Sequence, residues 1–213
     1  MRRLVILCRH GNTFKAGEQV VMVGAREDLP LTDVGEAQAH AVAGALQAMR
    51  VVPQRVYSGP LQRTKEFARL IIEQLGATVE IKIDARLTEL DYGAWGGLSD
   101  QEITEGWGAS VLEAWHLRGV RPQGVQFFPS ESELQGQVGA LLDELSLHDG
   151  VSLVVSSNGR LREFGRQIGK GEGSIAWKVR TGKVCVLEYL GEGWRVLLWD
   201  AEPMRLAEVV AAS

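Results

Sequence analysis

The residues best suited to chemistry in this sequence follow a short apolar run near its start. Arg9 and His10 come directly after the apolar residues 4–8, and Gly11 and Asn12 come next. An arginine and a histidine at the end of a buried strand, before a glycine that lets the backbone approach closely, suit the binding of an anion. The alternative is a polar surface turn without a function. We do not favour it, because the turn directly follows a run that is expected to be a buried strand.

A second cation follows the next apolar run, at residues 55–57. Arg63 falls in the first turn of a helix that we expect Pro60 to open, where the helix dipole disfavours a cation. A phosphate in front of this turn would supply the missing negative charge, and the planar guanidinium could hold it with two hydrogen bonds. The alternative is a solvated arginine on an ordinary helix.

One acidic residue is placed where a proton donor would be useful. Glu89 lies between Leu87 and Leu90, so part of its surroundings is apolar. Such surroundings suit a carboxyl group that acts as a general acid. A surface glutamate before a glycine-rich turn is the alternative.

A further polar turn follows the apolar residues 151–156. Ser157 and Asn158 precede Gly159 and lead into the start of a helix, which is compatible with an anion. Serine and asparagine are also common helix caps, so this turn alone is a weak indication.

These residues can meet only if a sheet brings the ends of their strands together. Longer segments with helical patterns separate six short apolar runs rich in β-branched residues. The runs that predict strands are residues 4–8, 55–57, 79–83, 151–156, 183–190 and 194–199. This alternation predicts an α/β fold with three layers, α/β/α, and a mostly parallel central sheet. Ligands of such sheets bind beyond the carboxyl ends of the strands.

The helices are predicted from their starts and their apolar stripes. Asp33 with Glu36, and Ser130 with Glu133, have capping-box spacing, and a short helix should follow Pro203. We expect Ala37, Ala41, Ala45 and Met49 to lie on one face of the first of these helices. We expect the second to bury Leu134, Val138, Leu141, Leu142 and Leu145. The glycines around Glu192 predict a hairpin at one side of the sheet, and residues 100–129 could form a lid or an irregular excursion.

Composition excludes several classes of partner. The 213 residues carry 23 Lys and Arg against 27 Asp and Glu, a net charge of −4, whereas nucleic-acid and anionic-membrane binders are basic. No apolar stretch approaches the 18 residues of a membrane span. Cys8 and Cys185 lie in apolar runs and are expected to be buried free thiols. We expect one domain over residues 1–213, located in the cytoplasm.

Taken together in their order, these motifs resemble the histidine phosphatase (phosphoglycerate mutase-like) superfamily. The resemblance covers most of the chain and rests on several blocks, each of them weak alone. The blocks are RHGNT at 9–13, DLPLT at 28–32, SGPLQRT at 58–64, LTE at 87–89 with Gly93, Trp95 and Gly97, and VVS at 154–156 with Gly159 and Arg162. The resemblance implies a phosphoglycerate mutase-like fold.

The resemblance also implies a mechanism. His10 would attack the phosphorus and carry a phosphohistidine, while Arg9 and Arg63 bind the phosphoryl oxygens and Asn12 adds a neutral donor. Glu89 would protonate the leaving oxygen. No metal and no cofactor are implied, and the partner would be a small phosphorylated substrate or inorganic phosphate.

One position departs from the family pattern. Ser157 stands where the family normally has a second histidine that faces the phosphate. Ser157 or Asn158 could still donate a neutral hydrogen bond, and Arg160 could restore positive charge. His148 and His40 are expected at the surface, away from the site, whereas His116 lies in the segment that the sequence does not place.

The function expected from these residues is a metal-independent phosphomonoesterase that acts on a small phosphorylated metabolite with reduced activity. A degenerate protein that binds a phospholigand or regulates is the alternative, and a phosphotransferring mutase is a lesser one. Mutases of the family generally have an insertion after the acid block, whereas only 68 residues separate Glu89 from Ser157 here. Basic residues that could extend the site to a second anionic group are Lys15, Arg26, Arg118 and Arg121. We expect most of Trp95, Trp107 and Trp115 to fill the core.

Overall fold

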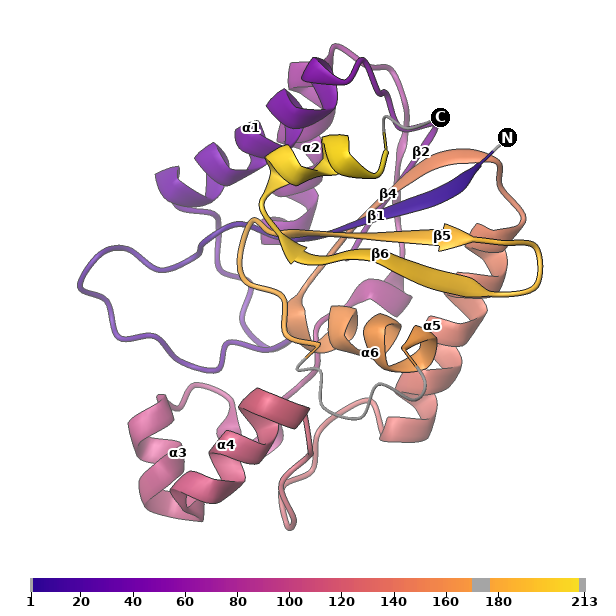
Figure 1. The fold of residues 1–213 in the computed structure, drawn as a ribbon. Coiled ribbons are helices and arrows are strands. Elements are labelled where there is room, and N and C mark those ends of the chain that lie inside the picture. The colour runs from indigo at the N-terminus through magenta and orange to yellow at the C-terminus, as the bar shows by residue number, and fades with distance from the viewer. Residues whose placement is uncertain (1, 170–176, 211–213) are drawn as a thin grey trace.

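A six-stranded sheet forms the centre of the computed structural model, which describes residues 2–169 and 177–210 (Figure 1). The strand order is β3-β2-β4-β1-β5-β6. The strands are β1 (Arg3–Arg9), β2 (Arg55–Ser58), β3 (Ile81–Ile83), β4 (Gly150–Ser156), β5 (Val184–Tyr189) and β6 (Trp194–Ala201). The first four strands of this order run parallel, and β5 and β6 are added antiparallel as a hairpin at one edge. The predicted α/β fold is therefore confirmed, with a mixed sheet.

Helices cover both faces of the sheet, α1 and α2 on one and α5 and α6 on the other (Figure 1). The α-helices are α1 (Asp33–Ala48), α2 (Gln62–Leu75), α3 (Asp100–Trp107), α4 (Ala109–Arg118), α5 (Glu131–Ser146) and α6 (Asn158–Ile168). Short 3-10 helices occupy Ala85–Leu87, Gly93–Trp95 and Pro203–Glu208. Among the described residues, no helix combines the length and apolar character that crossing a bilayer requires.

Alternation along β1 creates the two halves of the core. Leu4, Ile6 and Cys8 pack into the cluster with α1 and α2, whereas Val5 and Leu7 pack into the cluster with α5 and α6. Successive side chains of a strand point to opposite faces, so a run of consecutive apolar residues fits a strand covered on both sides. The end of β1 is thereby fixed from both faces, and with it the polar residues that come next in the chain.

Both cysteines are buried and free, as predicted. Cys8 lies on β1 and Cys185 on the neighbouring β5. Burial raises the pKa of both thiols, so they stay protonated and unreactive.

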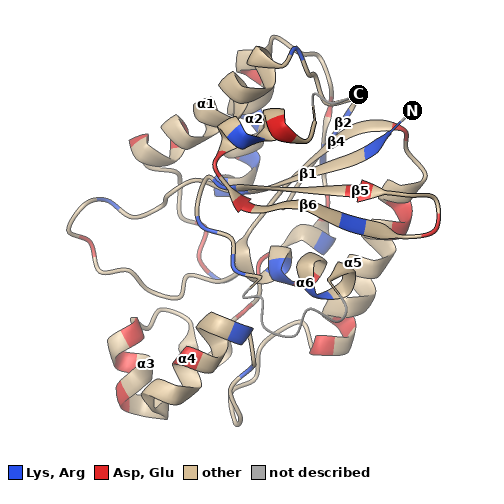
Figure 2. Cartoon of the chain, in the orientation of Figure 1, with Lys and Arg blue, Asp and Glu red and all other residues tan. Residues whose placement is uncertain are grey.

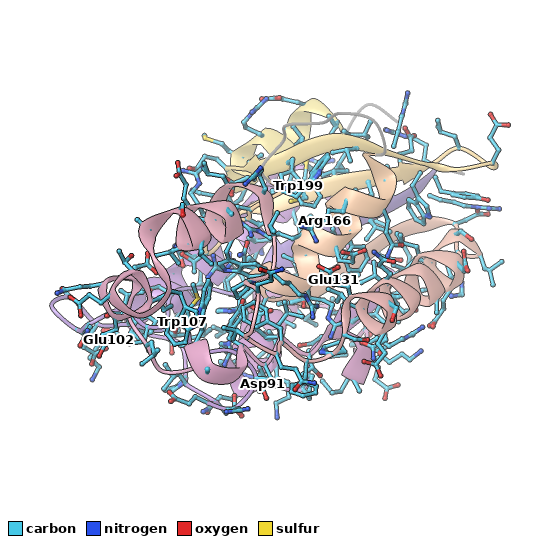
Figure 3. All side chains as sticks on the ribbon, turned by 90° about the horizontal axis from the view of Figure 1, so that it is seen from below. Asp91, Glu102, Trp107, Glu131, Arg166 and Trp199 are labelled. Atoms are coloured by element: carbon cyan, nitrogen blue, oxygen red, sulfur yellow. The ribbon has the colours of Figure 1, made fainter. Side chains whose placement is uncertain are left out.

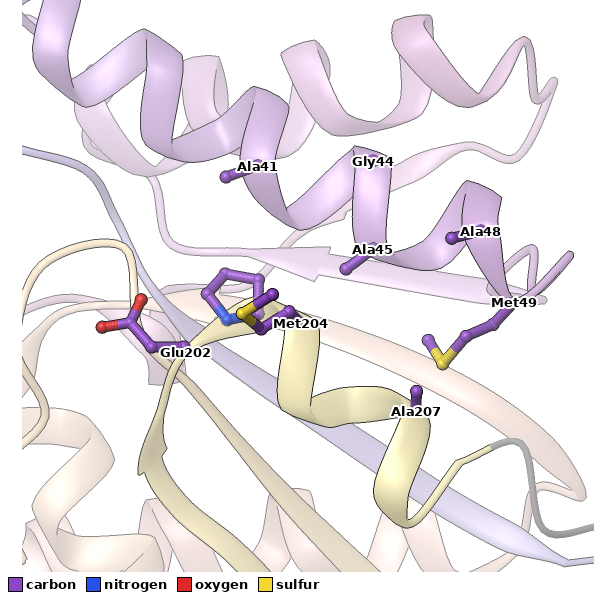
Figure 4. Close-up of a pocket in the computed structure, with 9 residues that line it drawn as sticks. Ala41, Gly44, Ala45, Ala48, Met49, Glu202, Met204 and Ala207 are labelled. Atoms are coloured by element: carbon purple, nitrogen blue, oxygen red, sulfur yellow. The ribbon is translucent and has the colours of Figure 1, made fainter.

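The core buries a different face of α1 from the one that the sequence pattern singled out. The helix is capped by Thr32, whose side chain accepts a hydrogen bond from the amide of Gly35 at 3.2 Å, and it buries Gly35, Ala39, Val42, Ala43 and Leu46. The predicted face instead has Ala37 exposed, while Ala41, Ala45 and Met49 line an open groove of about 530 Å³ beside Met204 and Ala207 (Figure 4). Alanine recurs on several faces of this helix, so its spacing did not single out the face that carries the larger Val42 and Leu46.

Other element boundaries agree more closely. The capping box of Ser130 and Glu133 and the five buried residues predicted for α5 are confirmed. Helix α2 begins at Gln62 after Leu61, two residues later than the predicted start at Pro60. Strand ends differ from the prediction by one or two residues, as is usual for element termini.

The segment 100–129 contains two helices rather than irregular chain. Helices α3 and α4 lie apart from the sheet, on the same side as the long loop of residues 10–32, beyond the carboxyl end of β1 (Figure 1). Trp95 and Trp115 are buried in the core and Trp107 packs against it, as predicted for most of these residues. The excursion therefore forms one wall of the region where the strands end.

Candidate active site

A cavity of about 370 Å³ lies at this edge of the sheet, between the loop of residues 10–32, α4 and the ends of β1 and β4. Six of the seven predicted site residues line it, although they come from four separate parts of the chain. They are Arg9, His10, Asn12, Arg63, Glu89 and Asn158. The parallel strands bring together the residues at their carboxyl ends, which is why side chains far apart in the sequence share one cavity.

His10 is held as a neutral imidazole with one nitrogen available. Its Nδ1 lies 2.7 Å from the carbonyl oxygen of Gly11, and a carbonyl can only accept, so Nδ1 carries the proton and Nε2 keeps its lone pair. Burial, and then the charges of Arg9 and Arg63, hold the pKa of His10 well below its ordinary value. The residue is therefore uncharged at neutral pH, as a nucleophile must be.

The turn that carries His10 is pressed against the start of α1. A Cβ on Gly11 would lie 2.3 Å from the carbonyl oxygen of Gly35, and a Cβ on Gly35 would lie 2.3 Å from the carbonyl oxygen of Asn12. Only glycine at both positions permits this approach of two backbone segments. The contact fixes the direction in which the His10 ring leaves the chain.

Two guanidinium groups flank His10 and are oriented by backbone carbonyls. Nη1 of Arg9 donates to the carbonyl of Val179 at 2.8 Å, and its buried Nε has no partner among the described residues. Arg63, with 2% of its surface exposed, donates to the carbonyls of Gly24 and Glu27 at 2.8 and 2.9 Å. Burial lowers the pKa of both arginines, yet arginine remains charged in proteins. An anion between them would be bound by oriented charges.

Glu89 lines the same cavity and is held there by backbone amides. Its Oε1 accepts from the amide of Leu90 at 2.8 Å and its Oε2 from the amide of Gly159 at 3.2 Å, at the start of α6. Tyr92, which also lines the cavity, contacts this carboxylate, and burial followed by the charge of Glu89 raises the pKa of the phenol well above its ordinary value. The carboxyl group is thus placed by backbone and faces the same space as His10.

The side-chain amides of Asn12 and Asn158 each make one hydrogen bond with the backbone and keep further hydrogen-bonding capacity. Nδ2 of Asn12 donates to the carbonyl of Phe14 at 2.7 Å. Oδ1 of Asn158 accepts from the amide of Val179 at 2.8 Å, and no described residue accepts a hydrogen bond from its Nδ2. A neutral donor near the anion is therefore available from Asn158.

Ser157 is placed differently from the other predicted residues. It caps the start of α6, is 1% exposed, and its Oγ has no hydrogen-bond partner among the described residues. Ser157 is not among the described residues that line the cavity. Arg160 is not among them either, because its guanidinium donates to the carbonyl of Thr88 and to the side chain of Gln137.

Further residues line the cavity that the sequence motifs did not assign to the site, among them Tyr92, Trp115 and Lys178. His116, which the sequence left open, lines it too, and its Nε2 lies 3.1 Å from Oδ2 of Asp100. The spacing of Tyr92 three residues after Glu89 was a signal that could have found it. Lys178 belongs to no motif, so nothing in its pattern indicated the site.

The basic residues proposed for a second anion subsite do not line the cavity within the described part of the chain. Lys15 lines a neighbouring cavity of about 350 Å³, and Arg26 is exposed and paired with Asp91 at 2.8 Å. Arg121 donates to the carbonyl of Pro129, and Arg118 is exposed at the end of α4. His40 is exposed, and His148 is half-buried beside β4 at the other end of the sheet.

Helix α4 is held against the site by two arginines of α6. Arg162 donates to the carbonyls of Trp115 (2.5 Å) and His116, and its guanidinium lies 5.1 Å from the centre of the Trp115 ring. Arg166, labelled on α6 in Figure 3, donates at 2.7 Å to the carbonyl of Gly119, at the end of α4. The carbonyls of His116 and Gly119 are ones that a helix end leaves without an intrahelical partner, whereas that of Trp115 also accepts from the amide of Gly119 at 2.8 Å. The bonds from the two arginines also fix the helix that carries Trp115 and His116 to the cavity.

Charge is unevenly distributed around the cavity. In Figure 2, blue segments gather where the strands end and at α6, whereas α3 is marked mainly by red. Within residues 2–169 and 177–210, no group of three or more His, Cys, Asp or Glu side chains is placed to hold a metal ion. The hydrogen-bond donors of Arg9, Arg63 and Asn158 that line the cavity suit an anion.

Comparison with known proteins agrees with this geometry. The family model described as the histidine phosphatase superfamily (branch 1) matches residues 5–202. A 2,3-bisphosphoglycerate-dependent phosphoglycerate mutase of Parvibaculum lavamentivorans is 32% identical over 116 residues, and one of a Methylobacterium species is 33% identical over the same length. These matches cover 54% of this chain and 54% and 55% of the two relatives, so the chain aligns with about half the length of each.

Solved structures share the fold over nearly the whole chain. A mycobacterial glucosyl-3-phosphoglycerate phosphatase is 22% identical with a TM-score of 0.75, covering 94% of this chain and 99% of its own. An alpha-ribazole phosphatase from Shigella flexneri is 22% identical with a TM-score of 0.71, covering 93% and 96%. The mycobacterial phosphatase has also been solved with VO3 and with inorganic phosphate.

Proposed function

The chain belongs to the histidine phosphatase superfamily, and from that premise we propose that it is a phosphomonoesterase that hydrolyses a small phosphorylated metabolite through a phosphohistidine at His10. The observation that carries the proposal is the neutral His10, with Nε2 unprotonated, in one cavity with two buried arginines and a carboxyl group. An unprotonated nitrogen beside oriented cations is what attack on a phosphoryl group requires.

The first half of the reaction transfers the phosphoryl group to the protein. Nε2 of His10 attacks the phosphorus, the bond from phosphorus to the ester oxygen breaks, and Glu89 gives a proton to that leaving oxygen. Arg9 and Arg63 stabilise the charge that spreads over the phosphoryl oxygens, and Asn12 and Asn158 are placed to contribute neutral donors.

The second half regenerates the protein. Glu89, now a carboxylate, takes a proton from water, whose oxygen attacks the phosphorus while the bond to Nε2 breaks. Inorganic phosphate leaves and Glu89 is again protonated. The proton that Glu89 takes in the second half replaces the one that it gave in the first, so the proposed cycle needs no other acid or base.

A second candidate function arises from Ser157. Its hydroxyl is buried and does not line the cavity, so this position supplies no charge where the superfamily pattern has a histidine. Removal of one transition-state donor typically costs on the order of 10² to 10³ in rate. The cavity would then serve a slow phosphatase or, alternatively, a protein that only binds a phospholigand.

One experiment separates the two candidates. Turnover of p-nitrophenyl phosphate is measured from pH 5 to 8 for the wild type and for His10→Ala, and acid-labile label is sought after brief incubation with phosphate-labelled substrate. The phosphatase proposal expects turnover and label in the wild type only. Rates equal to those of His10→Ala, together with measurable vanadate binding, would favour the binding protein.

Transfer between phosphoglycerates is a weaker candidate, supported by the names of the relatives that align with part of this chain. It predicts that the phosphoryl group of labelled His10 passes to an added phosphoglycerate faster than to water. The cytoplasmic location and the absence of a nucleic-acid partner stay predictions from the sequence.

A further inference from the structure

The superfamily pattern has a histidine at the start of α6, facing the phosphate, and the proposed function needs another source for the positive charge that it could carry. Ser157 brings no cation to the cavity, and Arg160, the neighbour best able to replace one, is engaged by Thr88 and Gln137 outside it. We propose that Lys178 supplies the positive charge that contacts the bound phosphoryl group in place of a residue at position 157. This inference rests on the proposed function.

The backbone places Lys178 beside both halves of the site. The next residue, Val179, is fully buried, and its carbonyl accepts from Arg9 while its amide donates to Asn158, both at 2.8 Å. The peptide that follows Lys178 thus bridges the end of β1 and the start of α6. Lys178 lines the cavity one residue from this bridge.

Within the described part of the chain, no carboxylate pairs with this charge. Among the described residues, no carboxylate lies within the 4 Å of an ion pair with Lys178, whereas Lys82 and Lys183 elsewhere in the chain each have such a partner. Partial burial lowers the pKa of Lys178, as do the charges of Arg162 and Arg9, while Asp100 and Asp200 oppose the shift. A cation placed beside two other cations is unfavourable until an anion binds.

His116 is the other candidate on this wall of the cavity. Its Nε2 faces Oδ2 of Asp100 at 3.1 Å, and burial lowers its pKa below the ordinary histidine value. It is therefore neutral at pH 7. Lys178 has no such carboxylate partner among the described residues, so we assign the contact with the phosphoryl group to it.

The test measures binding of vanadate, which imitates the phosphoryl group and carries no further substituent. Lys178→Met should weaken vanadate binding and lower kcat for p-nitrophenyl phosphate on the order of 100-fold, as expected when one oriented donor is lost. Lys178→Arg should keep most of both, because it keeps the charge. Lys65→Met, which removes an exposed lysine of α2 from outside the cavity, is the matched control and should behave as the wild type.

A second variant asks whether the charge replaces residue 157. Introducing Ser157→His into Lys178→Met should recover much of the lost vanadate affinity, because an imidazole there restores a donor at the start of α6. The same Ser157→His change in the wild-type background should gain far less. Equal gains in both backgrounds would mean that the two positions act independently, which contradicts the proposal.

The outcomes separate this inference from the proposed function. Vanadate binding that depends on Lys178 without any turnover would remove the phosphatase and keep the assignment of Lys178. Turnover and vanadate binding that are unchanged in Lys178→Met would overturn the assignment and keep the phosphatase. An increase in KM for larger substrates, with unchanged vanadate binding, would mean that Lys178 contacts a part of the substrate remote from the phosphoryl group, which overturns the assignment of Lys178. A wild type that binds no vanadate would overturn both the assignment of Lys178 and the proposed phosphatase.

Discussion

Adding one methyl group at Gly159 should separate the placement of Glu89 from the stability of the fold. A Cβ at Gly159 would lie 2.6 Å from Oε1 of Glu89 and 2.8 and 2.9 Å from Cγ and Cδ1 of Leu90. These distances are shorter than any normal contact, so one of the two side chains must move. Leu90 is 1% exposed and packs in the hydrophobic core, whereas Glu89 faces the larger cavity of the site. The carboxyl group is therefore the one expected to give way.

Two opposing terms set the effect of Gly159→Ala on stability. Alanine favours the helix over glycine by about 1 kcal/mol, less near its first turn. Crowding a packed site typically costs about 1 to 3 kcal/mol. The net loss in the free energy of unfolding should be about 0 to 2 kcal/mol, which leaves the protein folded.

The effect on activity should be larger. A displacement of about 1 Å can cost roughly 10²-fold in rate when a catalytic group must be aligned. The loss in kcat should be greater for an alkyl phosphate such as β-glycerophosphate than for p-nitrophenyl phosphate, because an alkoxide leaves only when it is protonated. Both substrates are assayed at one pH, together with urea unfolding of each variant.

Gly136→Ala is the matched control for this change. Gly136 lies on the exposed side of α5, and nothing lies within 4 Å of the position of its Cβ. This variant should be more stable by up to about 1 kcal/mol with unchanged kcat. If Gly159→Ala instead kept wild-type kcat on both substrates, the role assigned to the contact between Glu89 and α6 would be refuted.

Three further predictions concern the site and the segments that hold it. Below about pH 6.5, His10 takes up a proton in the unfolded chain but not in the folded protein, because its pKa is lowered on folding. The free energy of unfolding of the wild type, measured in urea, should therefore fall with decreasing pH more steeply than that of His10→Gln, by at most about 1.4 kcal/mol per pH unit. Parallel curves for the two proteins would contradict the lowered pKa. Arg162→Met should speed amide hydrogen exchange in α4, since it leaves the carbonyl of His116 without its donor at a cost of about 1 to 3 kcal/mol and removes one of the two donors to the carbonyl of Trp115. Unchanged exchange there would mean that α4 is held by other contacts. Gly35→Ala should lower the urea midpoint more than Gly159→Ala does, because its Cβ would meet a backbone carbonyl that cannot move aside; an equal or smaller loss would show that the backbone yields there.

The sequence was sufficient to place a functional residue where that residue directly follows a strand. Arg9 and His10 could be placed at the end of β1 because the run before them is apolar on both faces, and the parallel sheet then brings Asn158 alongside. The start of α5 was equally readable, since Ser130 and Glu133 satisfy each other's backbone groups locally. Such features depend on neighbours in the chain and leave a pattern of residue types.

Features that depend on distant packing left no such pattern. The buried face of α1 is set by the elements that cover it, so an alanine-rich helix offered several equivalent stripes. Lys178 reaches the cavity through the hydrogen bonds of the Val179 peptide, and backbone bonds can be made by almost any residue. Trp115 was expected in the core and lies there, yet it also lines the cavity because α6 holds α4 in place.

The way the arginines are held explains how the site keeps its charge. Elsewhere in the chain, Arg69 and Arg86 pair with carboxylates, which orient them and neutralise them together. Arg9 and Arg63 have no carboxylate within ion-pair distance among the described residues, and carbonyl oxygens orient them instead. A carbonyl dipole fixes a guanidinium without cancelling its charge, so both cations stay rigid and available. The same arrangement that lowers the pKa of His10 therefore prepares the cavity for a phosphoryl group before any substrate arrives.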